Sequence, residues 1–179
     1  MSEGARIIWI IFGDMSGGES VQDKLTAHYN GLRKDADKKG ITLGFLSASV
    51  TKKTFFKLIA EPAMVAFVWH SHGEYSPFAT GNMLAAGGEP IMASEIKRIA
   101  VSKRLQFAAL LGCGAFPSEA MRQEWLRALH LDGLSEPIRR LYAFGGTITA
   151  DRMYDFSSRR TLNNLSPFRF LDWLDMISL

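Results

Sequence analysis

The chain lacks the cysteine pairs that crosslink small extracellular proteins and the long apolar segments that anchor membrane proteins. Cys113 is the only cysteine among its 179 residues, which excludes an internal disulfide and suits a reducing compartment. The early apolar run IIWIIF is too short to cross a bilayer. No charged segment, long apolar region and cleavage site open the chain as in a signal peptide. We therefore expect a cytoplasmic protein without membrane contact.

Charge of one sign is also scarce. The formal net charge is +3, and the basic residues occur in scattered pairs such as Lys52-Lys53 and Arg139-Arg140. This pattern is typical of a solvated surface, so we do not expect direct contact with nucleic acid. Hydrophobic residues make up 47% of the chain and charged residues 22%, as in an ordinary globular protein. Without repeats or linkers, residues 1–179 are expected to form one domain.

Near-continuous apolar runs alternate with amphipathic stretches along the chain. This alternation predicts an α/β fold whose mostly parallel sheet is covered on both faces. The expected strands are 5–13, 41–50, 63–69, 105–114 and 138–150, and the expected helices are 21–40, 51–61, 92–103, 117–131 and 166–179. Residues 74–90 have no clear period and are expected to be a polar excursion.

The sequence AMVAFVWHSHG places two of only four histidines at the end of an expected strand. His72 follows the strand at 63–69, and Cys113 lies at the carboxyl end of the strand at 105–114. Ligands of such folds gather at the carboxyl ends of parallel strands. If these two strands are neighbours, His72 and Cys113 meet at one edge of the sheet.

A metal site is one interpretation of these residues. His70 and His72 are two apart, so they share a face of a strand, and Cys113 would add a third ligand of a type that zinc accepts. The motif WHSHG resembles the JAMM zinc peptidases. However, no aspartate lies between His72 and Asp132 to supply the carboxylate that this chemistry needs.

A phosphate cradle is a second interpretation, because GDMSGGES follows the first strand. A P-loop needs a lysine that reaches the phosphates, and this loop has none. Asp14 and Glu19 would repel phosphate, so a glycine-rich turn is favoured.

The third interpretation is a thiol nucleophile with a histidine base. Cys113 taken alone is more typical of a small buried hydrophobic residue, and His72 alone of a strand end. Together they form a more specific pattern, since glycines beside both residues let a substrate backbone approach closely.

The segments FVWHSHG, EPIMASEIKRI and FAALLGCGAF resemble the caspase-like (clan CD) cysteine peptidases, and most of all their CHAT-type branch, which is related to separase. The order is that of the family: strand into His-Gly, variable loop, short helix, strand into Cys. The Gln-Ala-Cys signature of true caspases is replaced here by Leu-Gly-Cys-Gly. The resemblance implies a three-layer sandwich whose mostly parallel central sheet has about five or more strands.

The resemblance also implies residue roles. Cys113 would be the nucleophile and His72 the general base and acid, while the backbone N–H groups of Gly73 and Cys113 would form the oxyanion hole. Asp151 and Asp14 are candidates for the substrate pocket, although each is also a natural turn residue.

The function that we expect is that of a cysteine endopeptidase acting on a protein substrate without a cofactor, controlled by a regulatory partner, by oligomerisation or by self-processing. Two alternatives stay open: a catalytically degenerate module that only binds a partner, and a zinc-dependent hydrolase using His70, His72 and Cys113. His70 either supports the strand end or competes with His72 as the base.

Overall fold

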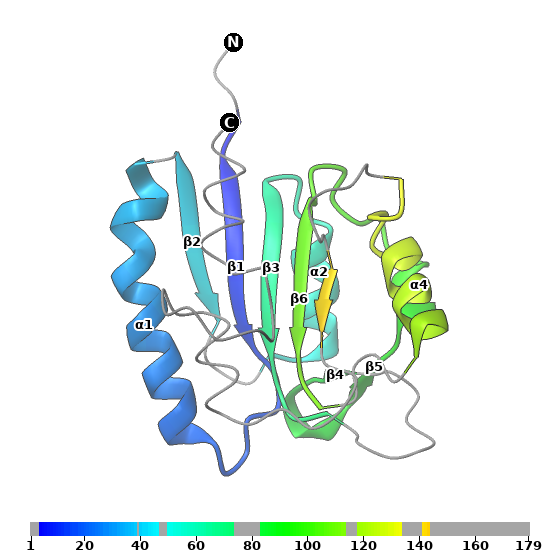
Figure 1. Ribbon diagram of the computed structural model, residues 1–179, viewed down its shortest axis with the longest axis horizontal. Coiled ribbons are helices and arrows are strands. Elements are labelled where there is room, and N and C mark those ends of the chain that lie inside the picture. The colour runs from blue at the N-terminus through cyan, green and yellow to red at the C-terminus, as the bar shows by residue number, and fades with distance from the viewer. Residues whose placement is uncertain are drawn as a thin grey trace.

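A parallel sheet forms the centre of the molecule (Figure 1). The computed structural model describes residues 4–38, 40–46, 50–73, 83–113, 118–133 and 141–143. The sheet has the order β2-β1-β3-β6-β7, and every neighbouring pair in it is parallel. Its strands are β1 Arg6–Phe12, β2 Ile41–Leu46, β3 Met64–His70, β6 Phe107–Leu111 and the short β7 Leu141–Ala143. The predicted α/β class is confirmed, as is the predicted adjacency of the strands that precede His72 and Cys113.

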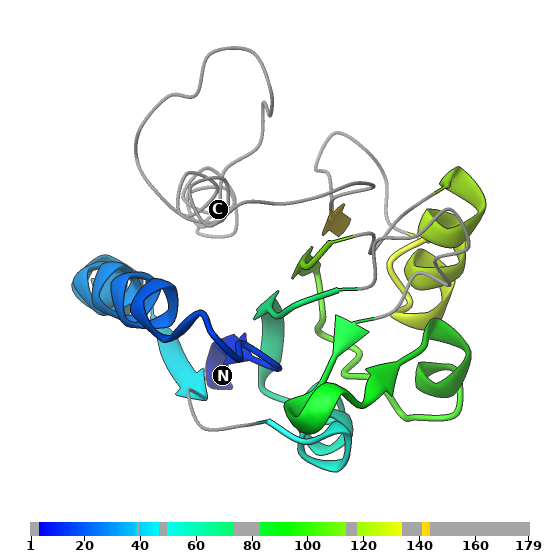
Figure 2. The same ribbon diagram turned by 90° about the horizontal axis from the view of Figure 1, so that it is seen from below.

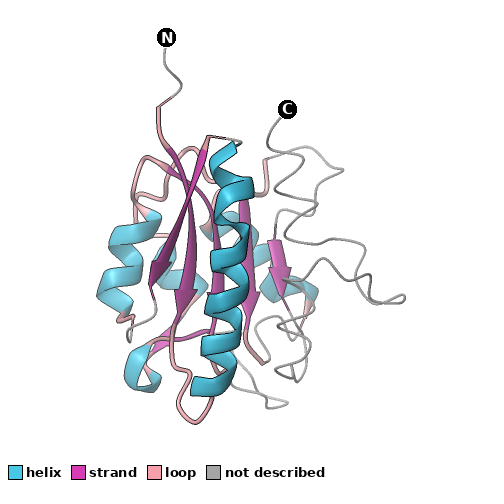
Figure 3. Cartoon of the chain, turned by 90° about the vertical axis from the view of Figure 1, so that its left-hand side faces the viewer, coloured by secondary structure: helices cyan, strands magenta, loops and turns pink. Residues whose placement is uncertain are grey.

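Helices cover both faces of the sheet, which explains why its strands are apolar on both sides. The helices are α1 Glu19–Lys38, α2 Lys52–Ile59, the single-turn α3 Ala93–Ile96 and α4 Glu119–Ala128. Helix α1 lies on one face, and α2, α3 and α4 lie on the other (Figures 2 and 3). Side chains alternate along each strand, so Val68 packs toward α1 whereas Phe67 and Trp69 pack toward α2.

The ends of the helices follow local capping chemistry. Thr51 caps α2, because its side chain accepts a hydrogen bond from the Thr54 N–H. Gly40 follows α1 with a φ of +66° that favours glycine. Helix α3 begins at Ala93, directly after its N-cap Met92, whose N–H donates to the Glu95 carboxylate.

The excursion expected at 74–90 contains structure that the sequence did not reveal. Strands β4 Met83–Leu84 and β5 Pro90–Ile91 pair as a small antiparallel hairpin around the 3₁₀ turn η1 Ala86–Gly88. Two-residue strands carry too short a pattern to be seen as periodic. In the described part of the chain, no helix has the length and apolar character needed to cross a membrane.

Candidate active site

The candidate site lies where the order of the sheet reverses. The chain places β2 on one side of β1 and β3 on the other, so the carboxyl ends of β1 and β3 flank a topological switch point. In open parallel sheets this is the edge at which ligands bind. The loop after β1 carries Asp14 and Ser16, and the loop after β3 carries His72. The strand next to β3 is β6, which ends just before Cys113.

His72 is held by the loop between β1 and α1. Its backbone N–H donates to the Asp14 carbonyl at 2.7 Å, and its Nε2 lies 2.8 Å from the Ser16 carbonyl oxygen. Because a carbonyl oxygen only accepts, Nε2 must carry the proton of this bond. In the neutral ring, Nδ1 is then the nitrogen that can accept a proton. His72 is exposed, so solvent can reach it.

Glycines bring the segments after β3 and β6 into backbone contact. The Ser71 N–H donates to the Leu111 carbonyl at 3.3 Å, which continues the pairing past the end of the strands. A Cβ atom added to Gly73 would lie 2.7 Å from the Cys113 nitrogen and would also collide with the Cys113 carbonyl. One added to Gly112 would lie 3.3 Å from the His72 carbonyl oxygen. Only a residue without a side chain fits at Gly73.

His72 and Cys113 extend from the same face of the sheet. Leu111 packs in the cluster of core residues beneath α1, and Cys113, two residues further along, is partly buried against the same cluster. Val68 and His70 likewise precede His72 by even steps, and the His72 ring is bonded to the loop that enters α1. These contacts place the thiol against the cluster beneath α1 and the imidazole against the loop that leads into α1. The direct approach of Cys113 Sγ to the imidazole stays a prediction.

Ser71 is a residue of this site that the sequence analysis missed. It is fully buried between two histidines, accepts a hydrogen bond from Trp69 Nε1 at 2.9 Å, and donates to the His72 carbonyl at 2.6 Å. The Ser71 hydroxyl thus helps to fix the backbone of His72 through this hydrogen bond. A single serine next to a strand carries no pattern that announces such a role.

His70 belongs to the core, where it supports the strand end, which was one of its expected roles. It is fully buried, its ring stacks on Phe12 with centroids 5.2 Å apart, and its Nε2 lies 3.0 Å from the Tyr29 hydroxyl. This placement gives no support to a role as the base. Within the described ranges, no three histidine, cysteine, aspartate or glutamate residues form a group that could hold a metal. The geometry therefore does not favour a zinc site of His70, His72 and Cys113.

The buried His70 predicts a loss of stability in mild acid. Burial lowers the pKa of His70 from 6.5 to about 3. The unfolded chain therefore binds a proton more readily than the folded one between these values. The contribution of the neutral, buried His70 to the free energy of unfolding is complete above pH 6.5. It falls by about 1.4 kcal/mol per pH unit as the pH drops toward 3.

Denaturant unfolding of wild type and His70→Phe at several pH values from 7 down to 4 measures this contribution. We expect a shallower pH dependence in His70→Phe, because phenylalanine fills the site without a titrating group. The exposed His130 has a φ of +56°, which asparagine tolerates, so His130→Asn is the matched control for replacing a histidine outside the core. Equal slopes in wild type and His70→Phe would contradict the prediction.

Of the two expected pocket residues, Asp14 lies at the site and Asp151 lies outside the described residues. Asp14 Oδ1 accepts a hydrogen bond from the Ser16 N–H at 3.0 Å, which is the turn role also foreseen from the sequence. The pKa of the Asp14 carboxyl is held below its ordinary value, first by this backbone bond, then by the Ser16 hydroxyl, and less by the charge of His72. An ionised carboxylate therefore stands beside the His72 ring at neutral pH.

Comparison of the chain with protein-family models, with curated proteins and with solved structures finds no match in any of the three.

Proposed function

We propose that this chain is a caspase-like cysteine endopeptidase of the CHAT-type branch, in which Cys113 is the nucleophile and His72 the general base. The observation that carries the proposal is the backbone contact between Gly73 and Cys113, on adjacent parallel strands and at the switch-point edge of the sheet. The same-side extension of the two side chains supports it.

In the proposed reaction, His72 Nδ1 takes the proton of the Cys113 thiol, and the thiolate attacks the carbonyl carbon of the scissile peptide bond. The backbone N–H groups of Gly73 and Cys113 donate to the oxygen that becomes negative in the tetrahedral intermediate. As the intermediate collapses, the carbon–nitrogen bond breaks and the leaving amine takes the proton from His72. Water, deprotonated by His72, then hydrolyses the thioester and releases Cys113.

The Ser16 carbonyl orients the His72 ring in this mechanism. Its hydrogen bond to Nε2–H keeps Nδ1 available, and it stabilises the ring when His72 is positively charged. The hydrogen bond from the His72 backbone N–H to the Asp14 carbonyl fixes the backbone from which the ring extends. A backbone carbonyl thus performs the task that an aspartate side chain performs in a catalytic triad.

Two other functions are compatible with the fold. A degenerate relative would keep the backbone of the site and bind a partner without cleaving it; a thiol-directed activity probe distinguishes it, because only an activated Cys113 reacts rapidly. The zinc-dependent hydrolase has less support, since His70 is buried and bonded toward Tyr29. We also propose that the protein is cytoplasmic and that residues 1–179 form a single domain. Its activity would be controlled by a regulatory protein partner or by oligomerisation.

Cleavage of a peptide library by the purified protein tests the proposed function, with Cys113→Ala as the matched control. Cleavage by wild type alone would support it. If neither protein cleaves any peptide and the thiol probe fails to label Cys113, the endopeptidase proposal is overturned.

The same library tests the pocket residues. We propose that Asp14 or Asp151 receives a basic side chain before the cut bond, because a carboxylate pairs strongly with arginine or lysine in a desolvated cleft. Asp14→Ala or Asp151→Ala should then lose the preference for arginine or lysine by about tenfold or more, equivalent to about 1.4 kcal/mol. An unchanged preference in both variants would remove the idea.

A further inference from the structure

A cavity of about 550 Å³ lies on the face of the sheet opposite α1, away from the loops that hold His72. One wall is a face of α2, formed by Lys53, Phe56, Lys57 and, just past the helix, Ala60. These residues follow one another at helical spacing, so their side chains point the same way. Ile99 belongs to the opposite wall. We call this cavity the α2 groove.

The walls of the α2 groove are tied together at both ends of α2. At the start, the Ala86 N–H donates to the Val50 carbonyl at 3.0 Å. At the end, the Ser102 N–H donates to the Ile59 carbonyl at 2.7 Å. These bonds join α2 to the segment that runs from the β4–β5 hairpin past α3. The separation of the two walls is therefore fixed by backbone hydrogen bonds at both ends of α2.

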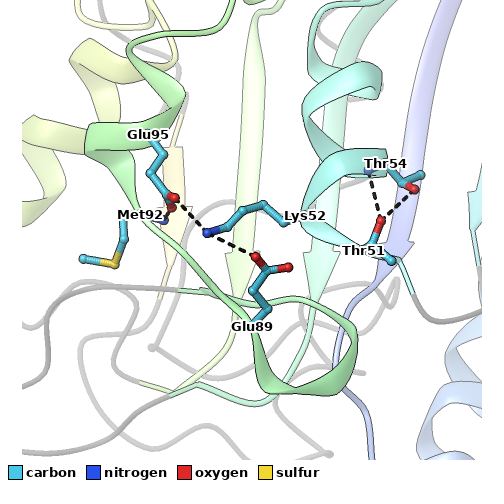
Figure 4. A network of polar contacts seen from close by, with 6 residues as sticks. All are labelled: Thr51, Lys52, Thr54, Glu89, Met92 and Glu95. Carbon is cyan, nitrogen blue, oxygen red and sulfur yellow. Dashed lines mark hydrogen bonds and ion pairs between the residues drawn. The ribbon is translucent and has the colours of Figure 1, made fainter.

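Lys52 adds a polar clamp at one end of the groove (Figure 4). Its Nζ donates to Glu95 Oε1 at 2.7 Å and lies 3.5 Å from Glu89 Oε1. Figure 4 shows the ammonium between the two carboxylates, which come from opposite sides of it. The charge of Lys52 is thus satisfied within the protein, and its side chain fixes the rim.

Lys53 and Lys57 are placed differently. Both are exposed on the groove wall one helical turn apart, and neither forms an ion pair with any residue in the described ranges. Phe56, Ala60 and Ile99 line the same groove, are only partly buried and present apolar surface. An apolar floor flanked by two cations without an ion pair in the described part of the chain is complementary to an anionic ligand that carries an apolar group.

We propose that the α2 groove binds an acidic segment of a partner protein, with a leucine or phenylalanine side chain seated against Phe56 and Ile99 and flanking carboxylates paired with Lys53 and Lys57. The apolar floor favours a peptide over a nucleic-acid backbone, which would need cations rather than a hydrophobic seat. The inference does not depend on the peptidase function, because the groove and the candidate active site use different residues on opposite faces of the sheet.

Binding of a fluorescein-labelled peptide, Gly-Asp-Glu-Leu-Phe-Asp-Glu-Leu-Asp-Gly, to the full chain tests the proposal by fluorescence anisotropy. We expect saturable binding that weakens with added salt. The double variant Lys53→Glu/Lys57→Glu should bind the peptide with an affinity at least tenfold lower than that of wild type. Wild type should likewise bind at least tenfold more weakly to a peptide in which serine replaces the leucine and phenylalanine. Lys24→Glu/Lys34→Glu is the matched control, since it reverses two exposed lysines of α1 on the other face, and its affinity should stay within about twofold of wild type.

Equal weakening in the groove variant and the α1 control would show a non-specific response to charge and would overturn the proposal. So would the absence of saturable binding at about 1 mM peptide. Sedimentation measures self-association of the chain, and vesicles of anionic phospholipid measure lipid binding. If the Lys53/Lys57 reversal abolishes either of these while the peptide fails to bind, the groove belongs to a second copy or to a membrane surface instead.

Discussion

Cys113→Ala is expected to abolish peptide cleavage while leaving the fold intact. No other cysteine can replace the nucleophile, so kcat/KM should fall by roughly a thousandfold or more. The thiol is only partly buried at the end of β6, and alanine occupies less space without introducing a polar group. We therefore expect a loss of about 1 kcal/mol in the free energy of unfolding, which lowers the melting temperature by about 2–4 °C.

His72→Ala should lower kcat/KM by about 10²–10⁴-fold, because the variant lacks the base that takes the proton of the Cys113 thiol in the proposed reaction. Its signature is the rate at which iodoacetamide alkylates Cys113, which should fall in His72→Ala. A variant that loses cleavage but keeps the wild-type alkylation profile would assign His72 a purely structural role.

His70→Phe separates the peptidase from its zinc alternative. The ring of His70 packs between Phe12 and Tyr29, so the variant should keep cleavage within about tenfold of wild type once folded. Zinc content and melting temperature are measured alongside cleavage for the Cys113, His72 and His70 variants. Joint loss of bound zinc and stability in all three would sink the cysteine-peptidase proposal, as would full activity in Cys113→Ala.

Gly73→Ala is expected to damage both stability and activity, although it adds only a methyl group. The new carbon would lie 2.7 Å from the Cys113 nitrogen and 2.9 Å from its carbonyl carbon, and these are backbone atoms that no change of rotamer can move. The segments after β3 and β6 must separate, at a cost of about 1–3 kcal/mol. A displacement of about 1 Å between base and nucleophile would lower kcat/KM by about a hundredfold.

Gly31→Ala provides the matched control for this substitution. Gly31 lies within α1 with nothing within 4 Å of a new Cβ, so alanine should stabilise the helix by about 0.5–1 kcal/mol and leave cleavage unchanged. Chemical denaturation and cleavage rates of both variants make the comparison. If Gly73→Ala resembles Gly31→Ala in both measurements, the close approach of the two segments is not required for function or folding.

The sequence predicted the parts of the fold that depend on long patterns. Continuous apolar runs announced β1, β3 and β6, because a strand buried on both faces needs apolar residues at every position. The β4–β5 hairpin escaped prediction, since two-residue strands carry no period and their pairing depends on packing against the rest of the chain. The end of α3 was placed too late, because the residues after Ile96 have helical spacing but form turns.

The candidate site was predictable only in part, for a related reason. His72 and Cys113 stand out because glycines flank reactive side chains at strand ends. The carbonyl of Ser16 cannot be identified from its residue type, since every residue has one and only the path of the loop aims it at Nε2. His70 misled the zinc interpretation because its Tyr29 contact joins residues far apart in the chain.

The pairing of β3 with β6 also determines when a newly synthesised chain can acquire the proposed activity. His72 leaves the ribosome well before Cys113, and parallel strands can pair only after the connecting chain has closed its crossover. Until β6 docks beside β3, the proposed base lacks the proposed nucleophile. A partly synthesised protein is thus silent by construction, and the proposed peptidase cannot cut its neighbours on the polysome before its own sheet is assembled.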